Sequence, residues 1–397
     1  MIVGMFYPQP SPTGKCAEAY VDLLKDQYDI SVICVADTDR KPYTYNGKNV
    51  FPASGNYMLF QNWLKKSNAP QLIQNVAKVP VHIVNRFTQP NLLYSYAAAA
   101  ERQLRKIHKE NTVDVIFSVG APMAAHVAAW RFRKKFPQVQ WINYTVDSYA
   151  AQNRNGPQAQ RALAFEKEIL GDSDWVLFSE EVYNNNQALY ADYTEKCSAL
   201  PYLMPPTPIV ELQESYFDSA KINLVYAGRF YKTIRNPEYL LQLAMEMDDR
   251  CVLHLYCQSD CDGLINDYVA RSRGKIVRHD PVSVDEIQRI YTQADILVSV
   301  GNNTPEFMPS KTFEYIASGK PIINVFYPGL KDAVLEQYPL ALQLERDTSI
   351  QVGGEMLCNF IQNTQYKQLT RERIDVIFHK HSAANIKKIL VERIRQR

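Results

Sequence analysis

Short apolar runs alternate with longer amphipathic stretches along most of the chain. Near-continuous apolar runs are typical of parallel strands buried on both faces, and amphipathic stretches are typical of the helices that connect such strands. In the first half, the predicted strands are Ile2–Phe6, Ile30–Val35, Val81–Val84, Val113–Val119, Val139–Tyr144 and Trp175–Ser179. The predicted helices there are Cys16–Leu24, Leu93–Lys109, Ala124–Lys135 and Gln158–Leu170. Residues 40–80 are polar and aromatic without a clear period, and we expect them to be irregular.

The alternation is interrupted at Leu200–Pro208, where four of nine residues are proline. Proline fixes φ and lacks the N–H group that helices and strands use, so this segment predicts a domain boundary. Beyond it, the predicted strands are Ile222–Ala227, Val252–Cys257, Lys275–Arg278, Ile296–Val300 and Ile322–Val325. The predicted helices are Pro237–Met247, Val284–Gln293, Lys311–Ser318 and a final basic helix, Ser382–Arg397. We therefore expect two α/β domains with parallel sheets, and a ligand site at a cleft beyond the carboxyl ends of their strands.

Composition and charge narrow the class of protein. The 397 residues are 46% hydrophobic and 22% charged, which excludes a disordered or collagen-like chain. With 44 basic and 42 acidic residues the net charge is +2, so nucleic acid is not an expected partner. Apolar runs such as Ile30–Ala36 are far shorter than the roughly 20 residues of a membrane helix. The pattern of Met1–Phe6 predicts a buried strand and not a secretory signal. The seven cysteines are scattered along the chain, which indicates reduced thiols. We therefore expect a cytoplasmic protein.

The segment after the strand Ile296–Val300 is suited to binding an anion. A polar loop ends at Ser310, a good capping residue for the helix that follows, and a helix start beyond a strand offers unpaired N–H groups and partial positive charge. Glu314 lies four residues after Ser310 on the same helical face, and Glu306 lies in the loop. The spacing of the two glutamates is weak evidence in a chain with 20 glutamates, so the prediction depends on the strand–loop–helix context.

A second group of polar residues follows the first strand of the second half. Ile222–Ala227 runs into Gly228, Arg229, Lys232 and Arg235. Arginine pairs bidentately with phosphate oxygens and stays charged at physiological pH. Solvated loop cations are the alternative, and the anion-binding helix expected in the same sheet favours phosphate binding.

These residues carry a resemblance to a known family. Gly228-Arg229, Arg235 and the segment 309–323 resemble the donor half of a GT-B glycosyltransferase, and they are most similar to family 4, the retaining nucleotide-sugar transferases. Segment 378–390 resembles the last helix of that family. The resemblance implies two Rossmann-like domains whose parallel sheets face each other across a cleft. They would be an acceptor-side domain at 1–203, with helix 380–397 packing back on it, and a donor-binding domain at 209–379.

The family pattern implies roles for the residues that would hold the donor diphosphate. Arg229 would bind the diphosphate, and Arg235 stands where the family usually has lysine, which keeps the charge and changes the reach. Ser310 and Lys311 would offer backbone N–H groups to the phosphates. Thr312 belongs to the same donor-binding segment.

Further roles concern the sugar and the acceptor side. Glu314 would accept hydrogen bonds from the ribose hydroxyls, and Glu306 would contact the transferred sugar. Gly14 and Gly228 belong to the donor-binding set. Gly14 would let the backbone approach the diphosphate and the acceptor. Asp147 stands where the family often has a histidine beside the donor sugar, and it either binds a hydroxyl or caps a loop.

His126 is a possible acceptor-side residue. It lies on a predicted helix after a strand of the first domain, and it either faces the cleft or is a buried structural histidine.

The resemblance implies transfer of a hexose from a nucleotide-diphosphate sugar, with UDP favoured, to a hydroxyl of a glycan or lipid-linked acceptor in surface polysaccharide or glycoconjugate synthesis. Arginines and a helix start would stabilise the leaving diphosphate, so no metal cofactor is expected. The rivals are a nucleotide-sugar epimerase on the same scaffold and a sugar-binding protein without catalysis. Residues 130–136 and 63–66 mix aromatic and basic side chains, which indicates peripheral contact with an anionic inner membrane or an ordinary helix end.

Overall fold

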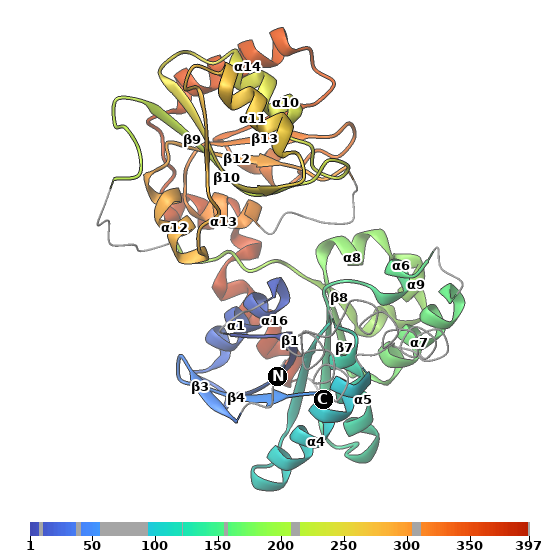
Figure 1. Ribbon diagram of the computed structural model, residues 1–397. Coiled ribbons are helices and arrows are strands. Elements are labelled where there is room, and N and C mark those ends of the chain that lie inside the picture. Colours follow the sequence, from blue (N-terminus) through green and yellow to red (C-terminus); the bar gives the residue numbers. More distant parts are fainter. Residues whose placement is uncertain are drawn as a thin grey trace, which may run out of the picture. The chain divides into compact units, whose positions relative to one another are not determined.

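The alternating pattern folds into two mostly parallel sheets (Figure 1). The computed structural model describes residues 1–7, 11–36, 41–55, 94–120, 122–154, 158–207, 215–303 and 311–395. The chain divides into two units, Met1–Leu203 with Lys380–Arg397, and Met204–His379. Each unit contains one sheet, so the predicted α/β class with parallel sheets is confirmed. None of the helices in the described ranges is long and apolar enough to cross a membrane.

The first sheet has the strand order β3-β4-β2-β1-β5-β6-β7-β8. The strands are β1 (Ile2–Met5), β2 (Ser31–Val35), β3 (Tyr43–Tyr45), β4 (Lys48–Ala53), β5 (Val115–Val119), β6 (Gln140–Thr145), β7 (Trp175–Ser179) and β8 (Cys197–Leu200). All neighbours pair in parallel except β3 and β4.

The antiparallel β3–β4 pair corrects the expectation that residues 40–80 are irregular. Tyr45 pairs with Lys48, so the turn contains two residues, Asn46 and Gly47, with φ of 47° and 74°. Asn-Gly is the sequence that most favours this hairpin turn, because both positions need positive φ. The predicted strand Val81–Val84 lies outside the described residues.

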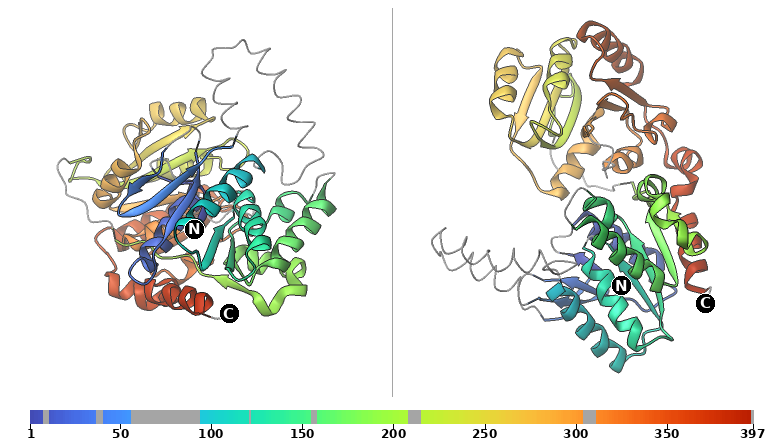
Figure 2. Two further views of the ribbon diagram at one scale, coloured as in Figure 1. Left: turned by 90° about the horizontal axis from the view of Figure 1, so that it is seen from below. Right: turned by 90° about the vertical axis from the view of Figure 1, so that its right-hand side faces the viewer.

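Helices cover both faces of the first sheet. On one face lie α1 (Pro12–Leu24) and the C-terminal α16 (Ala383–Arg395) (Figures 1 and 2). Side chains of both helices pack against sheet residues such as Phe117. On the other face lie α4 (Tyr94–Glu110) and α5 (Ala124–Lys135). The remaining helices of this unit are α6 (Tyr149–Gln152), α7 (Ala159–Asp172), α8 (Glu180–Asn185) and α9 (Gln187–Tyr190).

The second sheet is parallel throughout, with the order β11-β10-β9-β12-β13-β14. Its strands are β9 (Ile222–Phe230), β10 (Cys251–Ser259), β11 (Ile276–His279), β12 (Ile296–Val300), β13 (Ile322–Phe326) and β14 (Ala341–Glu345). The helices are α10 (Glu238–Met245), α11 (Asp262–Arg271), α12 (Val284–Gln293), α13 (Lys311–Ala317), α14 (Ile350–Thr364) and α15 (Arg371–Ile377). The elements α11, β14, α14 and α15 have no counterpart among the predicted ones.

Each sheet has a point where the direction of its strand order reverses. In the first sheet this switch point lies between β1 and β5, and in the second between β9 and β12. Chain segments leave the two strands toward opposite faces there, which opens a crevice at the carboxyl ends where ligands of such sheets bind. The loops that follow β9 and β12 are those that the sequence marks as phosphate-binding.

Candidate functional site

The loops after β9 and β12 are joined by hydrogen bonds. Tyr231 and Arg235 exchange two backbone bonds of 3.1 Å, which close the loop after β9. Asn303, in the loop after β12, donates from its backbone to Ile234 O at 2.9 Å and from its side chain to Thr233 O at 2.7 Å. The two loops at the switch point are thus held together.

Arg235 lines a cavity of about 110 Å³ at this switch point. Its Nε atom donates to Asn302 Oδ1 at 3.1 Å, and its Nη1 atom to the carbonyl oxygen of Arg229 at 3.4 Å. The other lining residues are Tyr226, Ala227, Ser299, Val300, Lys311 and Tyr315. The guanidinium is therefore oriented before any ligand arrives.

Lys311 brings a second cation to the same cavity. Its Nζ atom donates to the carbonyl oxygen of Ala227, near the end of β9. A Cβ atom on Gly228 would lie 3.0 Å from this Nζ and 3.1 Å from Tyr226 Oη, so the close approach favours glycine. The family pattern implies only a backbone role for Lys311, and nothing in the sequence indicates that its ammonium also lines this cavity.

Arg229 has a different environment from Arg235. β9 continues three residues beyond the predicted end at Ala227, so Arg229 lies on the strand itself. Its side chain is exposed, and the guanidinium carbon lies 5.1 Å from the ring centroid of Tyr231. Arg229 is not among the described residues that line the cavity, and it contributes its carbonyl oxygen to Arg235.

A side-chain hydrogen bond to Asp332 holds the first turn of α13 in place. Thr312 is 3% exposed, and its Oγ1 donates to Asp332 Oδ2 at 2.9 Å. Glu314 is half-buried in the same turn. Glu306 and Ser310 lie outside the described residues, so their predicted roles remain predictions.

Three predicted residues lie in the first unit. Gly14, in the first turn of α1, donates its N–H to the capping Ser11 Oγ at 3.2 Å. Asp147 follows β6, where burial raises the pKa of its carboxyl. The capping residue of α6 is the neighbouring Ser148, whose Oγ accepts from Ala151 N at 3.1 Å.

Glu166, a residue that the sequence did not indicate, holds the segment after Asp147. It is 2% exposed on α7 and accepts hydrogen bonds from Ser148 Oγ at 2.9 Å, Ala150 N at 2.8 Å and Tyr149 N at 3.1 Å. Burial raises its pKa, and these bonds oppose that shift. In sequence it is one more glutamate on an amphipathic helix, without a signal of its role.

His126, the third predicted residue, is buried in the first turn of α5 with 2% exposure. Its Nδ1 lies 2.8 Å from Ser118 Oγ, which also accepts a hydrogen bond from Trp141 Nε1 at 2.8 Å. Burial lowers the pKa of the imidazole to about 3, so the ring is neutral at physiological pH.

The basic end of α5 is paired within its own unit. Arg133 lies 3.0 Å from Asp174, Lys135 lies 3.0 Å from Glu101, and Lys134 lies 3.5 Å from Glu168. These ion pairs reduce the charge that the helix end offers to a membrane. Residues 63–66 lie outside the described residues.

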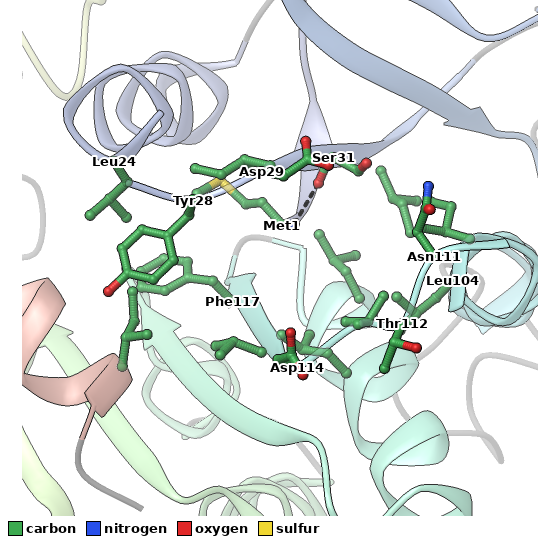
Figure 3. Close-up of a pocket in the computed structure, with 18 residues that line it drawn as sticks. Met1, Leu24, Tyr28, Asp29, Ser31, Leu104, Asn111, Thr112, Asp114 and Phe117 are labelled. Atoms are coloured by element: carbon green, nitrogen blue, oxygen red, sulfur yellow. Dashed lines mark hydrogen bonds between the residues drawn. The ribbon is translucent and has the colours of Figure 1, made fainter. Parts of the chain in front are cut away.

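A second cavity, of about 280 Å³, lies at the amino ends of β1, β2 and β5 (Figure 3). Its lining is mostly apolar, with Leu24 and Tyr28 on one side and Leu104 and Thr112 on another. It occupies the edge of the sheet opposite the carboxyl ends of the strands, so it is separate from the switch point of the first sheet.

No protein-family profile matches the chain, and no relative is found among curated protein sequences. Solved structures resemble the whole chain. Sucrose-phosphate synthase from Thermosynechococcus elongatus is 13% identical, with a TM-score of 0.61 over 100% of this chain and 98% of the other. The lipopolysaccharide outer core galactosyltransferase WaaB is 12% identical, with a TM-score of 0.59 over 99% of each chain. Anabaena HepE in complex with UDP-glucose is 9% identical, with a TM-score of 0.57 over 98% of each chain. The chain therefore has the GT-B fold of these proteins, with a parallel α/β sheet in each of its two units.

Proposed function

We propose that this protein is a glycosyltransferase that moves a sugar, a hexose by family resemblance, from a nucleotide-diphosphate sugar to a hydroxyl acceptor. The observation that carries the proposal is the pair of cations, Arg235 and Lys311, that line one cavity at the switch point of the second sheet beside Gly228. A diphosphate needs positive charge and close backbone approach, and this cavity offers both.

In the proposed reaction, these two cations stabilise the leaving diphosphate. The bond from the sugar C1 to the diphosphate oxygen breaks, a bond from C1 to the acceptor oxygen forms, and the acceptor proton passes to the departing phosphate. Arg235, held by Asn302, and Lys311, held by the Ala227 carbonyl, stabilise the negative charge that builds on the diphosphate. We propose that these groups act without a metal, and that attack occurs on the same face of the sugar, as the resemblance to family 4 implies.

The resemblance and the fold neighbours guide the choice of donor. HepE is described in complex with UDP-glucose and WaaB is a galactosyltransferase, so UDP-glucose and UDP-galactose are the first donors to test. Glu314 is the proposed partner of the ribose hydroxyls. Glu306 and Asp147 are the proposed contacts of the transferred sugar or acceptor, in a pathway that builds a surface polysaccharide or glycoconjugate in the cytoplasm.

Isothermal titration with UDP-glucose and UDP-galactose tests the proposal. Arg235→Gln and Lys311→Met are each expected to weaken binding of the accepted donor about tenfold or more, the range of a charge-assisted bond. Arg271→Gln, which breaks a surface pair with Asp267 on α11, is the control and leaves binding unchanged. If no nucleotide sugar binds, or both variants bind as well as the wild type, the proposal is wrong. Epimerised donor without an acceptor favours the epimerase, and binding without hydrolysis or transfer favours a sugar-binding protein.

We also propose peripheral contact with an anionic inner membrane through the basic end of α5, where the ion pairs of Arg133, Lys134 and Lys135 compensate much of the charge. Flotation with vesicles rich in anionic lipid tests it. Binding that survives charge reversal at Arg131, Arg133, Lys134 and Lys135 shows that this helix end is not the contact.

A further inference from the structure

The switch point of the first sheet has an uncapped helix start. α5 follows β5 and contains 12 residues, its N-cap residue Met123 makes no side-chain capping bond, and its first turn has no acidic residue. The first N–H groups of a helix have no acceptor within it and carry partial positive charge. In α5 the N–H of Ala125 already donates to the carbonyl oxygen of Pro122 at 3.0 Å, whereas those of Ala124 and His126 have no acceptor among the described residues. These two groups make this end of α5 suited to an anion.

A side-chain relay fixes the proton of His126 beside this helix start. The indole of Trp141 only donates, so Ser118 Oγ accepts from it at 2.8 Å. Ser118 is fully buried, and His126 Nδ1, 2.8 Å away, is the one acceptor that the described residues offer to its hydroxyl hydrogen, so we assign this bond as Ser118 donating to Nδ1. A neutral imidazole whose Nδ1 accepts carries its proton on Nε2. The low pKa that burial produces agrees with the neutral form.

The Nε2–H group of His126 is a buried donor without an acceptor among the described residues. It lies against Gly120, the first residue after β5, at the start of the β5–α5 connection. A second buried donor of this kind is Asn143 Nδ2, on the strand residue that pairs with Ser118. Buried donors are almost always satisfied in proteins, so these two point to an oxygen-rich group that binds here.

We propose that the β5–α5 junction binds an oxyanion, a phosphate group carried by the acceptor. His126 Nε2–H and the backbone N–H groups of Ala124 and His126 donate to it. Lys15, exposed in the first turn of α1 after the neighbouring β1, supplies positive charge. Asp147, after β6, is then placed for a hydroxyl of the same molecule. The identification of the phosphate carrier as the acceptor rests on the proposed function. The anion site itself consists of residues of the first unit only.

Imidazole ¹⁵N NMR with inorganic phosphate as the probe tests the site. The spectra are recorded on Arg235→Gln, which removes the competing phosphate contact of the second unit, and His126→Gln identifies the signal of His126. We expect the Nε2–H tautomer, a shift of its signal that saturates with phosphate, and an affinity about two- to fivefold weaker in Lys15→Gln, as for one charge near a helix start. Lys109→Gln, in the last turn of α4, is the matched control and leaves the affinity unchanged. A His126 signal that phosphate does not move, or equal affinities in the Lys15 and Lys109 variants, overturns the proposal.

Three further probes identify the carrier of the phosphate. A hexose 6-phosphate that binds more tightly than octyl phosphate indicates a sugar phosphate acceptor, and the reverse indicates a lipid-linked one. A neutral hexose that binds as tightly as its 6-phosphate overturns the proposal. These measurements need no nucleotide sugar. If neither UDP-glucose nor UDP-galactose binds, the proposed function is refuted and the anion site is unaffected. If phosphate does not bind at His126, the anion site is refuted and the proposed function is unaffected.

Discussion

The Nε2 atom of His126 lies 2.5 Å from the position that a Cβ atom on Gly120 would occupy. Real Cβ atoms do not approach other atoms so closely, so the imidazole fills the space that the glycine leaves at the end of β5. The ring is held from its other side by Ser118 and cannot turn away without breaking that bond.

Gly120→Ala is therefore expected to lower the free energy of unfolding by about 1–3 kcal/mol, the usual cost of overpacking a filled core. Gly263→Ala is the control, because nothing lies within 4 Å of the added Cβ and the residue is in the first turn of α11, where alanine is expected not to destabilise the protein. Urea denaturation followed by circular dichroism measures both. Equal stability of the two variants would contradict the close contact.

Two histidines in the second unit predict a loss of stability in acid. His254 Nε2 lies 3.2 Å from Asn223 Oδ1, and its Nδ1 lies 3.0 Å from His279 Nε2, so each ring is bonded in its neutral form. Burial, and then the proximity of His279, lower the pKa of His254 to about 4 from 6.5. The unfolded chain binds this proton first as the pH falls below 6.5, so stability is complete above 6.5 and is lost progressively down to pH 4.

We expect the pair to account for about 2 kcal/mol of this loss. One pKa unit corresponds to about 1.4 kcal/mol, and the total is smaller than the His254 shift alone would give because His254 and His279 titrate as a coupled pair. The measurement is urea denaturation between pH 4 and 8 for the wild type and His254→Leu. His126 contributes in the same direction in both proteins, so the difference between them isolates the pair. A parallel pH dependence in the two proteins would show that the pair plays no part.

The contact between Gly228 and Lys311 predicts a binding defect without unfolding. In Gly228→Ala, the new Cβ lies 3.0 Å from Lys311 Nζ and pushes the ammonium from its place. We expect UDP-glucose affinity to fall about three- to tenfold, up to the 1.4 kcal/mol of one decade. Gly301→Ala, at the end of β12, is the matched control because its nearest neighbour is 3.6 Å away, an ordinary contact. Titration calorimetry that finds equal affinities in the two variants would contradict this arrangement.

The bond between Thr312 and Asp332 is expected to support α13. Thr312→Val keeps the shape of the side chain and removes the donor, which leaves Asp332 Oδ2 without this bond and costs about 1–2 kcal/mol. Thr312→Ser keeps the hydroxyl and is expected to lose less stability. Thermal unfolding compares the two, and a serine variant less stable than the valine variant would show that the methyl group matters more than the bond.

Much of the fold and part of the candidate site could be predicted from local pattern. Near-continuous apolar runs such as Ile296–Val300 are typical of strands covered on both faces, and their alternation with amphipathic helices predicts mostly parallel sheets. The prediction placed Arg235 and Lys311 after strands of one sheet. The β3–β4 hairpin was missed although Asn46-Gly47 marked it, because residues around it have no regular apolar period.

The sequence by itself determined the class of fold and identified the carboxyl edge of each sheet, at which ligands of such folds bind, because both follow from which residues are apolar and in what order. Only the tertiary structure decided which polar groups meet. The ammonium of Lys311 reaches the Ala227 carbonyl because β9 and β12 are neighbours, and no local pattern encodes that contact. Trp141, Ser118 and His126 meet in one chain of hydrogen bonds because the adjacent strands β5 and β6 pack against the same helix. Such roles depend on distances between segments far apart in the chain, which folding alone sets.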